Sequence, residues 1–304
     1  MTKGKILITG AGGLVGTRLI EHLLRNEYEV KILSRDRVGF NNMEVFLWDI
    51  QKMEIDSNCV ADVDMIIHLA GEPIAGKRWT DRQKRMLVQS RVDSTILLAK
   101  ALKETPNRVQ RVISASAIGY YGNRADEVLT EDSAAGDGFL SDCCVLWEDA
   151  TNHIKALNIP VNILRLGIVL DRNKGSLPVM AKPIKLMAGA PLGNGKQWVS
   201  WIHQADLVSL IHHCMERKAE NVIFNAVSPH PVTNDTLTRA IAKKLHRPVW
   251  PVNVPEFALR AVLGEMADVV LTSTNVSAQK IISDDFTFTF LHLEDALSNI
   301  YGQS

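Results

Sequence analysis

The 304-residue sequence predicts an α/β protein built on a doubly wound parallel sheet. Apolar segments typical of strands alternate with amphipathic segments typical of helices up to about residue 170, which is the order expected of parallel strands joined by crossover helices. The first strand also runs directly into a glycine-rich turn and a helix. We therefore expect a Rossmann-type domain over residues 1–170. A smaller, irregular α/β lobe is expected over residues 171–304, with some of its segments returning to the main sheet.

The glycine-rich turn is the strongest local signal. After a strand-like segment at residues 5–9, glycines follow at a G-x-x-G-x-x-G spacing. The first can make a sharp turn, the second lets the backbone approach a pyrophosphate, and the third lets helix and strand lie close together. The unpaired N–H groups at the start of the helix face an anion there. The turn therefore predicts a nucleotide site, against the alternative of an ordinary strand–helix turn. The expected phosphate-side residues are Gly10, Gly13, Leu14, Val15 and Gly16.

The tip of the predicted second strand, residues 29–35, selects between the two nicotinamide cofactors. An acidic residue at this tip would accept hydrogen bonds from the ribose hydroxyls of NAD. This chain has Ser34 and Arg35 instead, and a hydroxyl with a guanidinium suits a 2′-phosphate. The tip therefore favours NADP over NAD. A solvated loop arginine is the alternative, and Asp36 and Arg37 nearby keep it open.

Later strands should end at the same edge of the sheet and face the cofactor. His68 closes an apolar run, and we expect it to pack within its strand rather than to act in catalysis. Residues 79–103 predict one long helix, either continuous or broken near Ser90. Further strands are expected over residues 45–48, 63–71, 111–117 and 160–170, and a further helix over residues 139–157.

The composition restricts the partners. Lys+Arg and Asp+Glu each number 34, so the formal net charge is zero, and no basic stripe indicates a nucleic-acid partner. No apolar run approaches the roughly 18 residues that span a bilayer, so we expect no membrane partner. The four cysteines have no metal-binding spacing, so no metal is expected. Four reduced thiols are typical of a cytoplasmic protein. The partner that remains is a small-molecule substrate.

Short motifs follow one another along nearly the whole chain. They are Leu69-Ala70-Gly71-Glu72, Arg78-Trp79, Ser90-Arg91, residues 117–122, Trp147-Glu148, residues 165–170, residues 201–203 and residues 225–229. Taken in this order with the glycine turn, they resemble the extended short-chain dehydrogenase/reductase superfamily of NAD(P)-dependent epimerases and dehydratases. More narrowly, the chain resembles an epimerase-like bacterial subfamily sometimes labelled as cell-division inhibitors.

The resemblance implies NADP binding at the glycine turn and at Ser34, Arg35, Leu69, Ala70 and Arg91. It also implies a possible homodimer through residues 79–103 and 139–157.

The resemblance also implies a Tyr-x-x-x-Lys pair on the helix of residues 139–157, and here the sequence departs from the pattern. The tyrosine of such a pair is a general acid/base, and the lysine lowers its pKa and holds the nicotinamide ribose. Matching Glu148 to the glutamate that usually follows the lysine places Leu140 and Cys144 at the two catalytic positions. Neither side chain can carry out the chemistry, so the hydride-transfer apparatus is incomplete by the rule of the superfamily.

Other side chains could replace the missing pair. Ser116 is the first candidate for a substrate-polarising hydroxyl and Ser114 the second, because alternate residues of a strand point to the same side. Tyr121, or less readily Tyr120, could supply a phenol, or the two rings could pack over the cofactor.

Two further sets of residues stay open as candidates. His203 and Asp206 could line the substrate side, or His203 could make a structural hydrogen bond in its loop. Cys143 or Cys144 could act as a nucleophile, although no partner histidine is identifiable.

Two functions follow from these observations. One is an NADP-dependent oxidoreductase or epimerase that acts on a small polar substrate, such as a nucleotide sugar. The other is an NADP-binding sensor or regulatory protein with little or no catalysis, which the departure at Leu140 and Cys144 favours.

Overall fold

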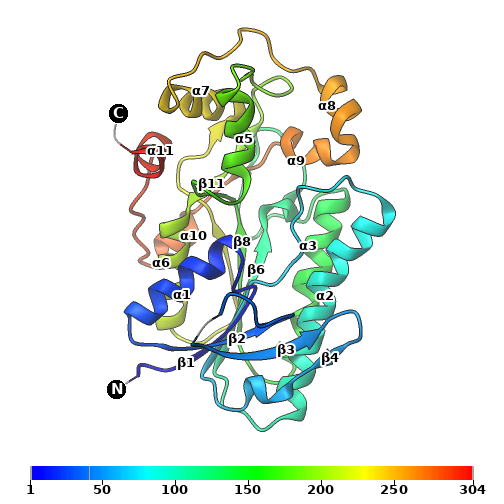
Figure 1. Cartoon of the computed structure of the whole chain (residues 1–304), viewed down its shortest axis with the longest axis vertical. Coiled ribbons are helices and arrows are strands. Elements are labelled where there is room, and N and C mark those ends of the chain that lie inside the picture. The colour runs from blue at the N-terminus through cyan, green and yellow to red at the C-terminus, as the bar shows by residue number, and fades with distance from the viewer. Residues whose placement is uncertain (1, 41, 303–304) are drawn as a thin grey trace.

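The computed structural model describes residues 2–40 and 42–302 and confirms the α/β class. Its centre is an eight-stranded sheet with the order β12-β8-β6-β5-β1-β2-β3-β4 (Figure 1). Every neighbouring pair is parallel except β3 and β4, an antiparallel edge that the sequence analysis does not predict. The strands are β1 (Lys5–Thr9), β2 (Glu29–Ser34), β3 (Glu44–Asp49), β4 (Glu54–Ile55), β5 (Met65–His68), β6 (Arg111–Ala117), β8 (Val161–Leu166) and β12 (Val222–Ala226).

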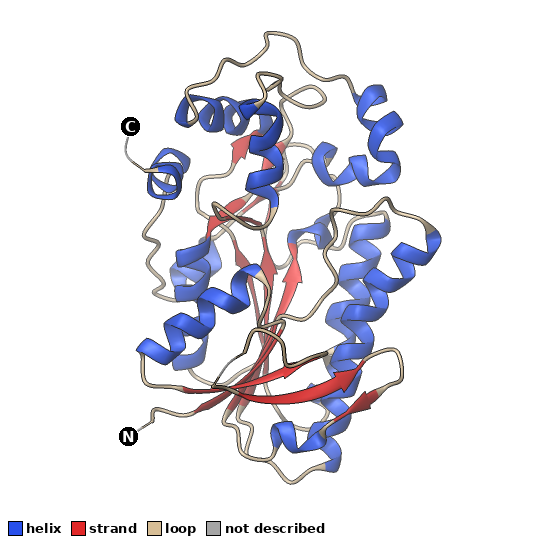
Figure 2. Ribbon diagram, in the orientation of Figure 1, coloured by secondary structure: helices blue, strands red, loops and turns tan. Residues whose placement is uncertain are grey.

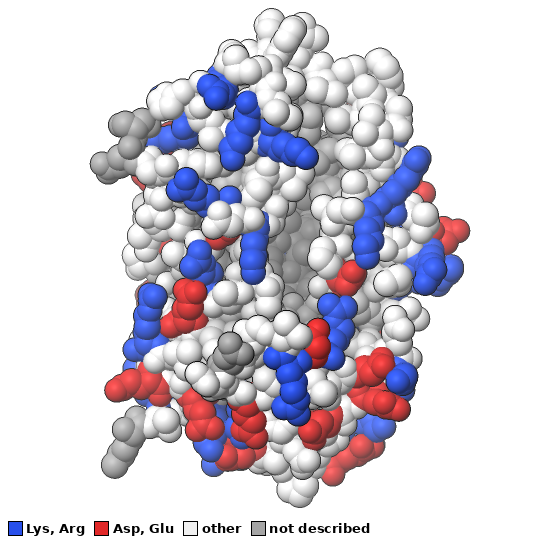
Figure 3. Space-filling model, in the orientation of Figure 1, with Lys and Arg blue, Asp and Glu red and all other residues white. Residues whose placement is uncertain are grey.

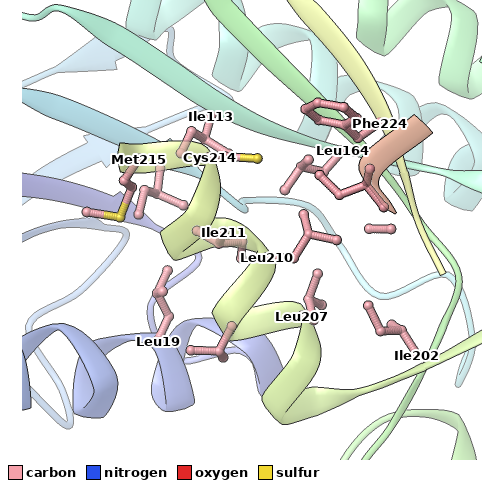
Figure 4. Packing of buried hydrophobic residues seen from close by; sticks show 14 of the residues in the cluster. Leu19, Ile113, Leu164, Ile202, Leu207, Leu210, Ile211, Cys214, Met215 and Phe224 are labelled. Carbon is pink, nitrogen blue, oxygen red and sulfur yellow. The ribbon is translucent and has the colours of Figure 1, made fainter. Parts of the chain in front are cut away.

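Helices cover both faces of this sheet, as Figure 2 shows. On one face lie α1 (Leu14–Arg25) and α6 (Gln204–Glu216), whose apolar side chains pack against β6, β8 and β12 (Figure 4). On the other face lie α2 (Asp81–Glu104), α3 (Phe139–Ala150), α4 (Asn152–Lys155) and the short helix η1 (Ser57–Val60). Strand residues alternate between the two apolar clusters, so Ile6 and Ile8 face α1 while Leu7 faces α2.

The two long helices predicted behind the sheet are both present, with different ends. The side chain of Thr80 accepts a hydrogen bond from the Gln83 N–H and caps α2, which then continues without a break at Ser90. Ser90 stays helical and donates its hydroxyl to the Leu87 carbonyl. The predicted helix over residues 139–157 is divided into α3 and α4 at Thr151.

The C-terminal part of the chain contributes to both halves of the molecule. Its β12 and α6 join the main sheet, whereas α5 (Ser176–Lys185), α7 (Asn234–Lys244) and α11 (Leu293–Tyr301) form a separate apolar cluster around Trp201. Figure 1 shows α5 and α7 above the sheet, beyond the ends of β6 and β8. The remaining elements are η2 (Ile118–Tyr121), β7 (Val128–Leu129), β9 (Ile168–Leu170), β10 (Trp198–Val199), β11 (Trp201–His203), β13 (Val232–Thr233), α8 (Glu256–Leu263), η3 (Gly264–Ala267), α9 (Asp268–Leu271), β14 (Asn275–Val276) and α10 (Gln279–Ser283).

None of the helices within residues 2–40 and 42–302 is long and apolar enough to cross a membrane. The same residues contain no group of three or more His, Cys, Asp or Glu side chains placed to hold a metal ion.

Candidate functional site

A cleft of about 290 Å³ lies at the carboxyl ends of the central strands. Figure 3 shows the molecule hollowed along its middle, with Lys and Arg side chains on both sides of the hollow. The carboxyl ends of parallel strands are the usual ligand position in an open α/β sheet. The lining comes from the glycine turn, the ends of β5, β6 and β8, and the two helices α2 and α3. It consists of Gly10, Gly13, Leu14, Val15, Gly16, Leu69, Gly71, Arg91, Ala115, Ser116, Ala117, Trp147, Leu166, Gly167 and Val169.

The glycine turn is built so tightly that side chains would not fit. A Cβ on Gly16 would lie 2.4 Å from the Gly10 carbonyl oxygen, and a Cβ on Gly10 would lie 2.6 Å from the Leu69 carbonyl oxygen. Gly10 also has a φ of +69°, a conformation that favours glycine. No side chain caps α1 at Gly13, so the first N–H groups of the helix stay available to a ligand in the cleft. All five residues predicted for the phosphate side therefore line the cleft.

Thr9, which the sequence analysis missed, fixes the neighbouring strand end. Its hydroxyl oxygen accepts hydrogen bonds from the backbone N–H groups of Leu69 and Ala70, each at 3.1 Å. Leu69 lines the cleft, and Ala70 is buried behind it. A hydroxyl residue that closes an apolar strand is the signal that could have identified Thr9.

His68 packs within its strand, as predicted. It is fully buried, and burial lowers its pKa to about 4, so the imidazole is neutral at pH 7. Its Nδ1 lies 2.8 Å from the Thr9 hydroxyl and its Nε2 lies 3.0 Å from the Thr95 hydroxyl. The Thr95 hydroxyl in turn donates to the Arg91 carbonyl. His68 therefore connects β1 and β5 to the part of α2 that carries Arg91.

Arg91 brings a buried positive charge into the lining of the cleft. Its guanidinium donates to two carbonyl oxygens, that of Leu87 at 2.8 Å and that of Glu72 at 3.0 Å, and lies over the Trp147 ring. No carboxylate of the described residues forms an ion pair with it. Burial lowers the pKa of Arg91, yet an arginine stays protonated in a protein. An anion in the cleft would offset the cost of burying this charge.

Ser34 and Arg35 lie beside the cleft rather than in its lining. Ser34 ends β2 and is half-buried. Arg35 is 74% exposed, and its Nη1 lies 3.8 Å from a carboxylate oxygen of Glu72, which follows β5. Arg35 follows β2 and Glu72 follows β5. The two residues therefore lie on either side of the glycine turn, because β2 and β5 are the neighbours of β1.

Ser116 lines the cleft, but its proton is already engaged. The hydroxyl donates to Glu148 Oε1 at 2.6 Å, and the same carboxylate accepts two hydrogen bonds from Arg165, both at 2.9 Å. Burial alone would lower the pKa of Arg165, but its bonds with Glu148 raise it overall. Ser116 can therefore present acceptor lone pairs to a ligand, not a free O–H. Ser114 is buried and donates to the Ala115 carbonyl.

The structure does not bring Tyr121 into the cleft. The ring is fully buried in the apolar cluster around α6, and its hydroxyl donates to Asn225 Oδ1 at 2.6 Å and accepts from Arg165 at 3.0 Å. Burial raises the pKa of Tyr121 to about 12, which opposes ionisation near neutral pH. The expected role as the catalytic phenol thus conflicts with this position, because the ring would have to leave its partners. Tyr120 packs under the guanidinium of Arg165, 3.5 Å from it.

His203 and Asp206 are structural rather than part of the cleft. His203 caps α6 through a hydrogen bond from the Ala205 N–H, and it is 2% exposed. Burial lowers its pKa. Asp206 is also buried and accepts from the backbone N–H groups of Thr289 and Phe290. His203 therefore does not line this cleft, and it makes the structural hydrogen bond that was the alternative.

The cysteines provide no nucleophile at the cleft. Cys143 and Cys144 are buried in α3, and burial raises the pKa of both thiols, that of Cys144 to about 12. A buried, protonated thiol is inert. Over its whole length α3 also contains neither Tyr nor Lys.

Lys174 is a second residue near the cleft that the sequence analysis missed. Its ammonium lies 3.2 Å from the Gly12 carbonyl oxygen, so a loop that follows β9 reaches the glycine turn. No sequence signal connects positions 162 residues apart.

Comparison with known proteins agrees with this geometry. The family model of the NAD dependent epimerase/dehydratase family matches residues 6–227, and a domain of unknown function (DUF1731) matches residues 254–300. The epimerase family protein YfhF of Bacillus subtilis is 35% identical over 298 residues, which covers 97% of each chain.

Two solved structures are similar over nearly the whole chain. Human epimerase family protein SDR39U1 (isoform 2), solved with NADPH, has a TM-score of 0.86 and 26% identity, covering 99% of this chain and 100% of that one. A nucleoside-diphosphate sugar epimerase from Corynebacterium glutamicum has a TM-score of 0.80 and 30% identity, covering 98% of this chain and 58% of that one. With its glycine turn, parallel sheet and matching family model, the chain belongs to the NAD dependent epimerase/dehydratase family.

Proposed function

We propose that the cleft binds NADP(H) and that the protein is an NADP-dependent oxidoreductase or epimerase for a small polar, nucleotide-sugar-like substrate. The observation that carries this proposal is the pairing of the uncapped α1 start with the buried, carboxylate-free Arg91 in one cleft. Both features favour a phosphate group. The NADPH in the similar human structure and the substrate class of the Corynebacterium enzyme support the choice of cofactor and of substrate.

In this proposal some residues bind the cofactor, and Ser116 orients the substrate. The glycine turn and Arg91 would hold the phosphates, and Ser34 and Arg35 would receive the ribose end. NADP(H), when bound, supplies or accepts the hydride. Ser116 would accept a hydrogen bond from a substrate hydroxyl, because its own proton is donated to Glu148. This polarity orients an alcohol for oxidation better than it stabilises an oxyanion.

A second candidate function is an NADP-binding sensor with little or no turnover. One observation favours it. Among the residues that line the cleft, Arg91 alone has an ionisable side chain, so the lining contains no group that titrates near neutral pH.

One experiment separates the two functions. The purified protein is titrated with NADPH by fluorescence and then incubated with NADPH or NADP⁺ and a panel of nucleotide sugars and small carbonyl compounds, while the nicotinamide absorbance is followed. Turnover that falls at least tenfold in Ser116→Ala supports the enzyme. Tight binding without turnover over the whole panel supports the sensor. If NADPH does not bind, both proposals are wrong.

A further inference from the structure

Three charged side chains lie together beside the cofactor cleft. The carboxylate of Glu72 is 3.8 Å from the guanidinium of Arg35 and 3.6 Å from the ammonium of Lys77. The two cations are 74% and 65% exposed, whereas Glu72 is only 21% exposed. Figure 3 shows basic and acidic side chains side by side at the lower end of the hollow. This Arg35–Glu72–Lys77 cluster contains two positive charges and one negative charge.

The strand register places the cluster across the glycine turn. Thr9, the last residue of β1, pairs with Leu33 of β2 on one side and with His68 of β5 on the other. Arg35 follows Leu33 by two positions and Glu72 follows His68 by four. The ion pair between Arg35 and Glu72 therefore joins the two strands that flank β1, beyond its carboxyl end. A dinucleotide on the glycine turn would have its adenosine end between these strands.

Hydrogen bonds hold the backbone of Glu72 in place, whereas the two cations are exposed side chains. Its N–H donates to the Ser90 hydroxyl at 3.0 Å, and its carbonyl accepts from Arg91 at 3.0 Å. Arg35 and Lys77 are exposed, long and rich in rotamers. The Glu72 carboxylate, on a backbone held by these two bonds, lies within ion-pair distance of both cations but beyond hydrogen-bonding distance of either.

The surplus charge fits a phosphate monoester. Such a group carries about −1.5 to −2 charges at pH 7 and has three acceptor oxygens, so it can bind two cations at once. Glu72 offers a single negative charge at ion-pair distances that are long for a hydrogen bond. The ribose of NAD has hydroxyls there instead, which gain less from an ammonium group.

We propose that Lys77 acts together with Arg35 as the receptor of the ribose 2′-phosphate of NADP(H), and that Glu72 holds both cations in place until the phosphate replaces it. The proposal rests on the proposed function and deepens it, because it names the residues that set the preference for NADP over NAD. Lys77 and Arg35 together determine the specificity, and Glu72 is a competitor that lowers the affinity.

The test compares dissociation constants for NADPH and NADH in the wild type, Lys77→Gln and Glu72→Gln, at low and at high salt. We expect Lys77→Gln to weaken NADPH binding about fivefold to tenfold, the effect of one exposed charge-assisted bond, and to change NADH binding less than about twofold. We expect Glu72→Gln to tighten NADPH binding about threefold. Both effects should shrink at high salt, because exposed charges are screened.

Lys100→Gln is the matched control, since Lys100 is an exposed lysine of α2 outside the cluster. It should leave both dissociation constants unchanged. If Lys77→Gln leaves NADPH binding at the wild-type value, or weakens NADPH and NADH equally, the proposal is wrong while the NADP(H) site stands. If the wild type binds neither nucleotide, the proposed function itself fails. Thermal unfolding of each variant shows that the fold is retained.

Discussion

Two groups of polar residues differ in how many partners they find within the protein. One is the part of the cleft formed by the glycine turn and Arg91, and the other is the network of Ser116, Glu148, Arg165 and Tyr121. On the phosphate side, α1 begins without a side-chain cap, Arg91 has carbonyl partners only, and the buried Trp147 indole N–H has no partner. In the network, by contrast, Arg165 has a two-point bond to Glu148 and a further bond to the Tyr121 hydroxyl. A buried cation without a carboxylate partner and a helix start without a cap leave room for an anionic ligand, whereas a fully paired network stabilises the fold.

This difference separates binding residues from structural ones better than residue type does. Tyrosine and histidine are common catalytic residues, yet the Tyr121 hydroxyl and the His203 Nδ1 atom are buried and bonded within the protein. Arg91 and the glycine turn contain no acid or base that could react near neutral pH, yet they form the part of the cleft prepared for a ligand. Four changes test this division.

The largest effect is expected from Arg165→Leu. The variant leaves the Glu148 carboxylate buried without its cation, which costs about 3–5 kcal/mol of unfolding free energy. Urea unfolding measures the loss. Arg239→Leu, which breaks an exposed pair with Asp235, is the control and should cost less than about 1 kcal/mol. A stable Arg165→Leu protein would show that the network is not structural.

The second effect is a pH dependence that comes from His68. Its folded-state pKa of about 4 lies below the ordinary value of 6.5. Between these two pH values, His68 is protonated in the unfolded chain and neutral in the folded protein. The stability contribution is complete above pH 6.5 and is lost as the pH falls towards 4, a loss of roughly 3 kcal/mol. Unfolding of wild type and His68→Gln across this range measures it. If the unfolding free energy of the two proteins changed equally with pH, His68 would not be the buried, neutral imidazole described above.

The third change, Gly16→Ala, tests whether the glycine turn binds the cofactor. In Gly16→Ala the new Cβ would meet the Gly10 oxygen at 2.4 Å and the Ala11 Cα at 2.7 Å, so α1 must move away from the turn. We expect NADPH binding to weaken roughly 30-fold to 100-fold, an overpacking cost of about 2–3 kcal/mol. Calorimetric titration measures it. Gly12→Ala is matched, because its Cβ would meet only Phe40 at 3.8 Å, and it should bind NADPH like the wild type.

The smallest effect is expected from Tyr121→Phe. Loss of the hydroxyl leaves a buried Asn225 oxygen without its donor and should cost about 1–2 kcal/mol of unfolding free energy. Turnover of any substrate found in the panel should stay within about twofold of the wild type. Abolished turnover in a folded variant would move Tyr121 from the structural network to the catalytic residues.

The sequence alone predicted the sheet class, the glycine turn, the second strand with its polar tip and the buried state of His68. These features depend on local patterns, since the period of apolar residues and the position of glycines act over a few residues. The antiparallel β4 edge was missed because two residues show no periodicity. Of the two alternatives for the long helix, the structure has the continuous one, α2.

The roles of individual side chains were decided only by the tertiary structure. Tyr121 and Asn225 are 104 residues apart, and Arg35 meets Glu72 from another strand. No local pattern determines whether a hydroxyl or a guanidinium finds its partner inside the protein, because that partner comes from a distant segment. The sequence therefore determined that this chain has a glycine turn between its first strand and helix, and the packing of distant strands and helices decided which polar groups around that turn remain without partners.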